Sequence, residues 1–200
     1  MKKLPKMYTE KEREYIIKKL KEAALRSLTL HGVKKTTVDD IVNTVNIPKG
    51  TFYLFYKSKE LLLFDVINDI HNDIQAQLLS KVACVHGNMT SEQLTDLIFE
   101  IFKEIDNTCL LKIMTNGDLE LLMRKLPDNI VAEHLAHDDL SIDQLFHLIP
   151  QAKEKNIEYF SGAFRGIFLT LLYKREIGED IFEEALKLMI NGLVLQLMEE

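Results

Sequence analysis

Apolar residues recur every three or four positions along most of the chain, and the alternation that marks β-strands never persists. This spacing places apolar side chains on one face of a helix, so the pattern predicts an all-α protein. A first helix is expected over about residues 10–31. Thr9 and Glu12 form a capping-box pattern at its start, and Gly32 follows its end.

Two short helices and one long helix are predicted next. Thr37 and Asp40 repeat the capping pattern and open the first of them. Asn46 suits a tight turn because asparagine tolerates a left-handed backbone. A third helix is expected over about residues 48–56, and Ser58 would cap a long fourth helix that ends near residue 82.

The second half of the chain has strong helical patterns at both of its ends. Thr90 and Gln93 begin a helix in the same way as the N-terminal capping pattern. Two further helices are predicted over about residues 155–175 and 180–198, separated at Gly178. Between residues 110 and 155 the pattern does not fix helix boundaries.

Charge divides the chain into a basic start and an acidic remainder. The whole chain of 200 residues has a net charge of −6. Residues 1–60 hold 14 basic and 7 acidic side chains, a net charge of +7, whereas the other 140 residues carry −13. This asymmetry favours a basic module for a polyanion that is joined to an acidic body.

Several classes of protein are not expected from the sequence. The charged start runs into no apolar segment and no stretch reaches the roughly 18 apolar residues of a membrane span, so we expect a cytoplasmic protein without a membrane partner. Cys84 and Cys109 fit reduced thiols. No catalytic motif or cofactor fingerprint is present, so neither an enzyme nor a cofactor is expected. His134 and His137 resemble metal-ligand spacing, but surface positions are favoured and no metal is expected.

The stretch NIPKGTFYLFYKSKELLL has four aromatic residues within five positions and lysines on both sides. A helix turns about 100° per residue, so these aromatics cannot all face one core. Placing Phe52 and Phe55 toward the preceding helices leaves Lys49, Tyr53 and Tyr56 facing outward. A phenol and a lysine can both bind phosphate oxygens.

Three short helices inside a basic segment of about 60 residues predict a helix-turn-helix, whose third helix would enter the major groove of DNA. Gly50 would let the backbone approach a surface, Thr51 would meet base edges, and Lys59 would meet a phosphate. On these grounds, the residues expected to bind DNA are Lys49, Gly50, Thr51, Tyr53, Tyr56, Lys57 and Lys59.

From Thr36 to Leu62 the sequence resembles the DNA-binding domain of TetR-family transcriptional regulators. The positions that carry the resemblance are Thr37, Val38, Ile41, Val42, Asn46, Lys49, Gly50, Tyr53, Phe55, Tyr56, Lys59 and Leu62. The resemblance implies that the side chain of Thr37 also binds a phosphate, beside its role in capping a helix. The family often has a phosphate-binding Tyr or His where this chain has Phe55, and a buried Phe where it has Tyr56. Whether Tyr53 or Tyr56 makes the main phosphate contact therefore stays open.

The resemblance implies a three-helix DNA-binding domain over residues 1–57 and a helical ligand-binding and dimerisation domain over residues 58–200. The last two helices would form the dimer interface. Its expected residues are Phe164, Ile167, Phe168, Leu171, Leu186, Met189, Ile190, Leu193 and Leu197. The candidates for a ligand pocket are Met89, Phe99, Phe102, Met114 and Met123.

The function implied is that of a homodimeric transcriptional regulator on a palindromic double-stranded DNA operator. We expect a repressor that a small apolar or amphipathic effector releases from DNA. The alternative keeps the DNA-binding part and makes the second domain a protein-interaction or constitutive dimerisation module without a ligand.

Overall fold

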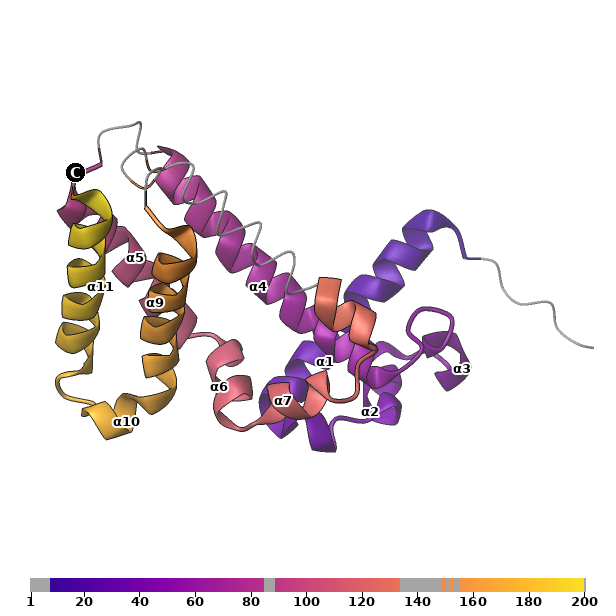
Figure 1. The fold of residues 1–200 in the computed structure, drawn as a ribbon. Helices are drawn as coiled ribbons and strands as arrows, with labels where there is room; N and C mark the ends of the chain where they lie inside the picture. Colours follow the sequence, from indigo (N-terminus) through magenta and orange to yellow (C-terminus); the bar gives the residue numbers. More distant parts are fainter. Residues whose placement is uncertain (1–7, 85–88, 134–148, 150–151, 153–154, 200) are drawn as a thin grey trace, which may run out of the picture. The chain divides into compact units, whose positions relative to one another are not determined.

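The computed structural model describes residues 8–84, 89–133, 149, 152 and 155–199. Every regular element in these ranges is a helix, which confirms the all-α prediction (Figure 1). His134 and His137 lie outside the described residues.

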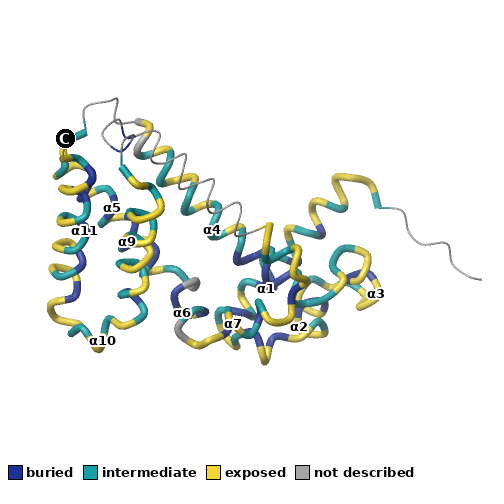
Figure 2. The backbone as a smooth tube through the Cα atoms, in the orientation of Figure 1, coloured by how far each residue is buried: buried dark blue, intermediate teal, exposed yellow. Residues whose placement is uncertain are grey.

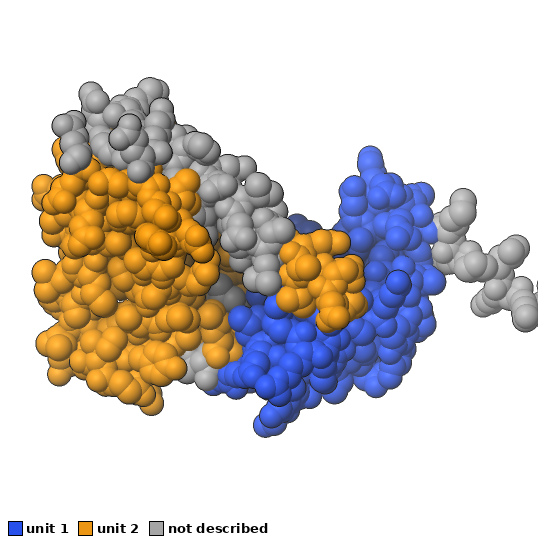
Figure 3. All heavy atoms as spheres, in the orientation of Figure 1, with its two compact units in different colours: residues 1–69, 116–126 blue, residues 70–115, 127–200 orange. Residues whose placement is uncertain are grey.

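The chain folds into two compact units (Figure 3). Unit 1 comprises residues 1–69 and 116–126, and unit 2 comprises residues 70–115 and 127–200. Unit 1 thus includes more of the chain than the predicted domain over residues 1–57. It gains the start of the long helix α4 and a segment from the middle of the sequence.

Unit 1 consists of short helices packed around the long first helix. Its elements are α1 (Glu10–Lys35), α2 (Val38–Val45), α3 (Lys49–Phe52), the start of α4 (Lys59–Cys84) and α7 (Asp118–Met123). Helix α1 packs against both α2 and α7, and α2 packs against α3. The apolar faces of these helices meet in one core, to which Leu20, Leu28, Ile41, Phe52, Leu62 and Leu63 contribute fully buried side chains.

Local signals in the sequence set the start and end of α1. The Thr9 hydroxyl accepts a hydrogen bond from the Glu12 amide, and the Glu12 carboxylate accepts one from the Thr9 amide, which confirms the predicted capping box. Gly32 leaves the helical conformation, with φ 75° and ψ 176°. Because glycine alone readily adopts this conformation, the first helical stretch breaks at the predicted residue, but α1 resumes after this kink and runs to Lys35.

The turn between α2 and α3 is also as predicted, but α3 is shorter. Asn46 has a left-handed backbone (φ 58°, ψ 48°). Beyond Phe52 the chain continues as a tight turn, in which the amides of Phe55 and Tyr56 both donate to the Phe52 carbonyl. Ser58 accepts a hydrogen bond from the Leu61 amide and caps α4, as expected.

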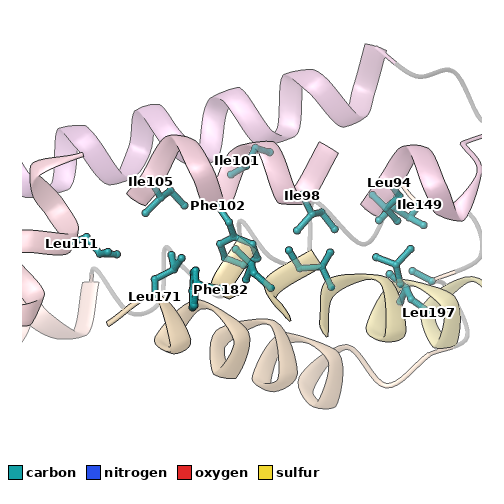
Figure 4. Packing of buried hydrophobic residues seen from close by; sticks show 14 residues of the cluster. Leu94, Ile98, Ile101, Phe102, Ile105, Leu111, Ile149, Leu171, Phe182 and Leu197 are labelled. Atoms are coloured by element: carbon teal, nitrogen blue, oxygen red, sulfur yellow. The ribbon is translucent and has the colours of Figure 1, made fainter. Parts of the chain in front are cut away.

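Unit 2 is a helical body with its own core. Its elements are the remainder of α4, α5 (Ser91–Asp106), α6 (Cys109–Thr115), α9 (Ile157–Thr170), the 3₁₀ helix η2 (Leu171–Tyr173), α10 (Lys174–Ile177) and α11 (Phe182–Met198). Helix α11 packs against α5 and α9. Figure 4 shows apolar side chains of α5, such as Ile98 and Phe102, in this core together with Phe182 and Leu197 from the C-terminal part.

The capping and break signals of unit 2 are confirmed, but the helix predicted over residues 155–175 divides into three pieces. Thr90 and Gln93 form the predicted capping box of α5. Gly178 separates α10 from α11 with φ 114°. Within the described ranges no helix is both long enough and apolar enough to span a membrane.

Candidate nucleic-acid interface

The third helix of unit 1 is held by one buried aromatic ring. Phe52 is 0% exposed, and it lies at the end of α3 where the chain turns toward α4. The amide of Ile47 donates to the Val42 carbonyl and closes the turn between α2 and α3. The geometry is that of a helix-turn-helix, with α3 as the second helix of the pair.

Four residues in and just after α3 form one exposed strip, which we call the α3 strip. They are Lys49, Gly50, Tyr53 and Leu54. Positions i, i+1, i+4 and i+5 lie on the same side of a helix. The buried residues between them, Thr51 and Phe52, face the interior.

The burial of Thr51 corrects one predicted DNA contact. Its side chain was expected to meet base edges, but the residue is only 8% exposed. Leu54 is 51% exposed and was not among the predicted DNA-binding residues. The prediction missed Leu54 because leucine has no hydroxyl, amide or charged group. Helical spacing could have found it, because Leu54 lies four positions after Gly50 and therefore on the same face.

The four aromatic residues divide into buried and exposed rings. Tyr53 is 51% exposed, and its ring rests edge-on against Phe52 at 5.2 Å between centroids. Phe55 is half-buried between Tyr8, at 5.9 Å, and the Arg13 guanidinium, at 5.1 Å from the ring centre. The predicted inward positions of Phe52 and Phe55 thus hold, completely for Phe52 and in part for Phe55.

Tyr56 has an internal partner. Its hydroxyl donates to Asp65 Oδ2 on α4 at 2.6 Å, and Lys21 Nζ on α1 lies 2.9 Å from the same oxygen and 2.7 Å from Asp69 Oδ2. Burial and the bond to Asp65 raise the pKa of the Tyr56 hydroxyl. Burial lowers the pKa of Lys21, but the bonds to Asp69 and Asp65 outweigh it and the net shift is upward. This network joins the end of the α3 turn to α1 and α4.

Conservative replacement of the two phenols should separate a surface role from a packing role. Tyr53→Phe should leave the melting temperature unchanged and lower DNA affinity by about 1.5 to 3 kcal/mol, the range for hydrogen bonds to charged groups. Tyr56→Phe should instead lower the melting temperature, because Asp65 loses a partly buried hydrogen-bond donor. Differential scanning calorimetry and fluorescence anisotropy with labelled operator measure both quantities. A DNA defect confined to Tyr56→Phe at unchanged stability would assign the phosphate contact to Tyr56.

Lys59 also turns toward the protein. Its ammonium group donates to the carbonyl oxygens of Val33, at 2.9 Å, and Thr36, at 2.6 Å. Thr36 is fully buried, and its hydroxyl donates to the Gly32 carbonyl. Lys59 therefore satisfies carbonyl groups where α1 ends, which goes against its predicted use as a phosphate ligand.

The remaining predicted DNA-binding residues lie on the surface of unit 1. Thr37 is exposed, caps α2 by accepting from the Asp40 amide, and donates to the Asp40 carboxylate. Lys57 is exposed in the segment before α4. Lys49 is exposed and forms an ion pair with Asp39 on α2, at 2.9 Å between Nζ and Oδ2. The hydrogen bond to Asp39 raises the pKa of Lys49.

The five residues predicted to line a ligand pocket are not brought together in one unit. Met123 belongs to α7 in unit 1, whereas the other four lie in unit 2. Phe102 is buried in the core of unit 2, and Met89 and Phe99 pack against that core. Among the described residues no group of three or more His, Cys, Asp or Glu could hold a metal ion.

The exposed α3 strip on a helix-turn-helix defines the class of the protein, a DNA-binding regulator with a separate helical body. Residues 20–66 match the family model of the bacterial regulatory proteins of the tetR family. The helix-turn-helix segment therefore matches the tetR family, in agreement with the resemblance seen between Thr36 and Leu62.

Several known proteins are similar to this chain in sequence or in fold. An uncharacterized HTH-type transcriptional regulator of Bacillus subtilis (strain 168), YhgD, is 27% identical over 126 residues, which are 54% of this chain and 66% of that protein, slightly less than two thirds of its length. A TetR family transcription regulator from Marinobacter aquaeolei has the same fold, with a TM-score of 0.60, 16% identity and coverage of 92% of this chain and 98% of that one. Thermus thermophilus FadR, a TetR-family repressor in complex with lauroyl-CoA, gives a TM-score of 0.58 at 18% identity, covering 92% and 95%.

Proposed function

We propose that the protein is a homodimeric repressor that binds a palindromic operator through the α3 strip and leaves it when a small amphipathic ligand binds. The observation that carries the proposal is the exposure of Lys49, Gly50, Tyr53 and Leu54 on one side of the short helix that follows the turn. A cation and a phenol suit phosphate groups, and the remaining two positions leave room for base edges.

A face of unit 2 supports the homodimer. Helices α9 and α11 both have many exposed positions (Figure 2). Apolar and small residues among these positions form one stripe along each helix. The first stripe consists of Tyr159, Gly162, Ala163, Gly166 and Leu169 of α9 together with Tyr173 of η2. The second consists of Ile181, which directly precedes α11, together with Leu188, Gly192 and Leu195 of α11. A Cβ atom added at Gly162, Gly166 or Gly192 would meet nothing within 4 Å. These glycines leave space for another helix to approach closely.

These stripes replace part of the interface predicted from the sequence. Leu171, Leu186, Ile190 and Leu197 were expected at the dimer interface, but they are buried in the core of unit 2. The other predicted residues are partly buried, and Phe164, Ile167, Phe168 and Met189 pack against that core. The residues proposed to contact the second subunit are therefore those of the two exposed stripes.

The DNA-binding mode follows from two-fold symmetry. A homodimer presents two copies of α3, and a palindromic operator presents two equal half-sites. The two copies fit successive major grooves only when they are about 34 to 36 Å apart. A ligand that changes this separation would release the protein from DNA.

For the ligand we propose an amphipathic molecule of the acyl-coenzyme A type. The support is the likeness in fold to the Thermus thermophilus repressor that binds lauroyl-CoA, together with a body built from apolar helices. The test is to select an operator from random duplexes with the full-length chain and then to titrate the complex with lauroyl-CoA. Release at micromolar concentrations supports the proposal. Binding of DNA that no acyl-CoA changes favours a constitutive dimerisation module.

The ion pair between Asp39 and Lys49 gives a separate prediction about DNA affinity. On binding, Lys49 must exchange the Asp39 carboxylate for a phosphate, and Asp39 adds a negative charge beside DNA. Asp39→Asn should therefore raise operator affinity several-fold at low salt and lower stability by at most about 1 kcal/mol, the upper end for an exposed ion pair. Lys49→Gln should lower affinity and reduce the salt slope by about 0.9 for each phosphate that the lysine neutralises in the wild type.

The double variant tests whether the effect of Asp39 depends on Lys49. If Asp39 acts by holding Lys49, Asp39→Asn should give a smaller gain in the Lys49→Gln background than in the wild type. Fluorescence anisotropy between 50 and 200 mM salt measures the affinities, a range over which phosphate contacts change them strongly. An equal gain in both backgrounds would show that Asp39 acts directly on DNA instead.

A further inference from the structure

Leu54 is the apolar member of the α3 strip. Its amide donates to the Thr51 carbonyl at 3.1 Å, so the turn after α3 fixes the backbone at this position. Half of the residue is exposed, although the adjacent rings of Phe52 and Phe55 are buried or half-buried. The position thus points a branched apolar side chain away from the core of unit 1.

Gly50 lies one helical turn before Leu54 on the same strip. A Cβ atom added at Gly50 would meet nothing within 4 Å, so packing inside the protein does not require glycine here. The two positions together form a patch without any hydrogen-bonding side chain, beside Lys49 and Tyr53. A surface that enters the major groove with this patch brings carbon atoms, rather than donors or acceptors, against the base edges.

The major groove offers one apolar group on its base edges, the C5-methyl group of thymine. The nitrogen and oxygen groups there are donors or acceptors, and they lose hydrogen bonds to water when leucine covers them. We propose that Leu54 is a specificity-determining residue that selects thymine in each operator half-site by packing against this methyl group. The inference rests on the proposed DNA contact through the α3 strip and adds the base that one of its residues recognises.

The experiment uses the full-length chain and an operator selected from random duplexes. Each thymine in turn is replaced by deoxyuridine, which keeps every hydrogen-bonding group and removes only the methyl group. At one symmetric pair of positions the affinity of the wild type should fall about fourfold per methyl group, or about 15-fold when both half-sites are substituted. Fluorescence anisotropy measures each affinity.

Two variants assign the effect to Leu54. In Leu54→Ala the same replacement of thymine by deoxyuridine should change affinity less than about twofold, because the packing partner is gone. Leu30→Ala is the matched control, since Leu30 is an equally apolar residue of unit 1 that is 73% exposed on α1 and outside the α3 strip. It should keep the full preference for thymine.

The outcomes separate this inference from the proposed function. Equal affinity of the wild type for thymine and deoxyuridine at every position overturns the inference while leaving DNA binding intact. A preference for thymine that persists in Leu54→Ala also overturns it, because another residue then contacts the methyl group. Failure to select any operator overturns the proposed function itself.

Discussion

Replacing Gly32 with alanine should destabilise unit 1 by about 2 to 5 kcal/mol, the sum of backbone strain and overpacking. Gly32 has φ 75° and ψ 176°, a conformation that residues with a Cβ atom rarely adopt. An added Cβ atom would also lie 2.5 Å from Oδ2 of Asp118, a buried residue at the start of α7. Hydrogen exchange of peptides from α1 to α3 in increasing urea measures the loss within this unit.

Two further variants separate the steric clash from the backbone strain. Gly117→Ala is the matched control, because Gly117 also has a positive φ, 70°, but an added Cβ atom would meet nothing within 4 Å. Gly117→Ala should lower the free energy of unfolding by about 1 to 2 kcal/mol. In an Asp118→Ala background, Gly32→Ala should lower the free energy of unfolding by less than it does in the wild type. An equal cost in both backgrounds would show that Asp118 gives way freely and that strain alone accounts for the loss.

Replacing Gly166 with glutamate should convert the proposed dimer to monomers and reduce operator affinity by at least about 100-fold, since only one half-site is then held. The monomer itself should not be destabilised. The position is exposed with open space around it, and glutamate is a better helix former than glycine by roughly 0.5 to 1 kcal/mol. In a close contact between helices, however, two unpaired carboxylates lose their water.

Sedimentation equilibrium and anisotropy with the selected operator measure these two effects. Arg175→Glu is the control, because it changes the net charge by more than Gly166→Glu does but lies on α10, outside both stripes. Among the described residues, this variant breaks only a surface ion pair with Glu179. It should remain dimeric. A Gly166→Glu protein that stays dimeric and binds operator like the wild type would place the subunit contact elsewhere.

The features that could be predicted from the sequence are those fixed by a few neighbouring residues. The capping boxes at Thr9 and Thr90 depend on side chains three positions apart, and the left-handed turn at Asn46 depends on one residue. The inward position of Phe52 followed from helical spacing alone. Each of these has a local cause, so a single short stretch of sequence was enough to find it.

The features that could not be predicted depend on partners distant in the sequence. Lys59 appeared as a surface cation, because the carbonyl groups that it meets belong to residues more than 20 positions earlier. The apolar spacing in the last two helices predicted a dimer interface that included Leu186 and Ile190, but these residues are covered by the same chain. An apolar spacing does not specify what covers it. The α3 strip was found only in part because Leu54 carries no polar group.

The chain passes between unit 1 and unit 2 three times, after residues 69, 115 and 126. This connectivity restricts how such regulators can exchange parts. A single crossover after residue 69 would join one protein's helix-turn-helix to another protein's residues 116–126. In such a hybrid, Gly32 would pack against the residue that the other protein has at the position of Asp118. A hybrid with a new operator preference should therefore inherit residues 116–126 together with residues 1–69, so the smallest transferable DNA-reading module is discontinuous in the gene.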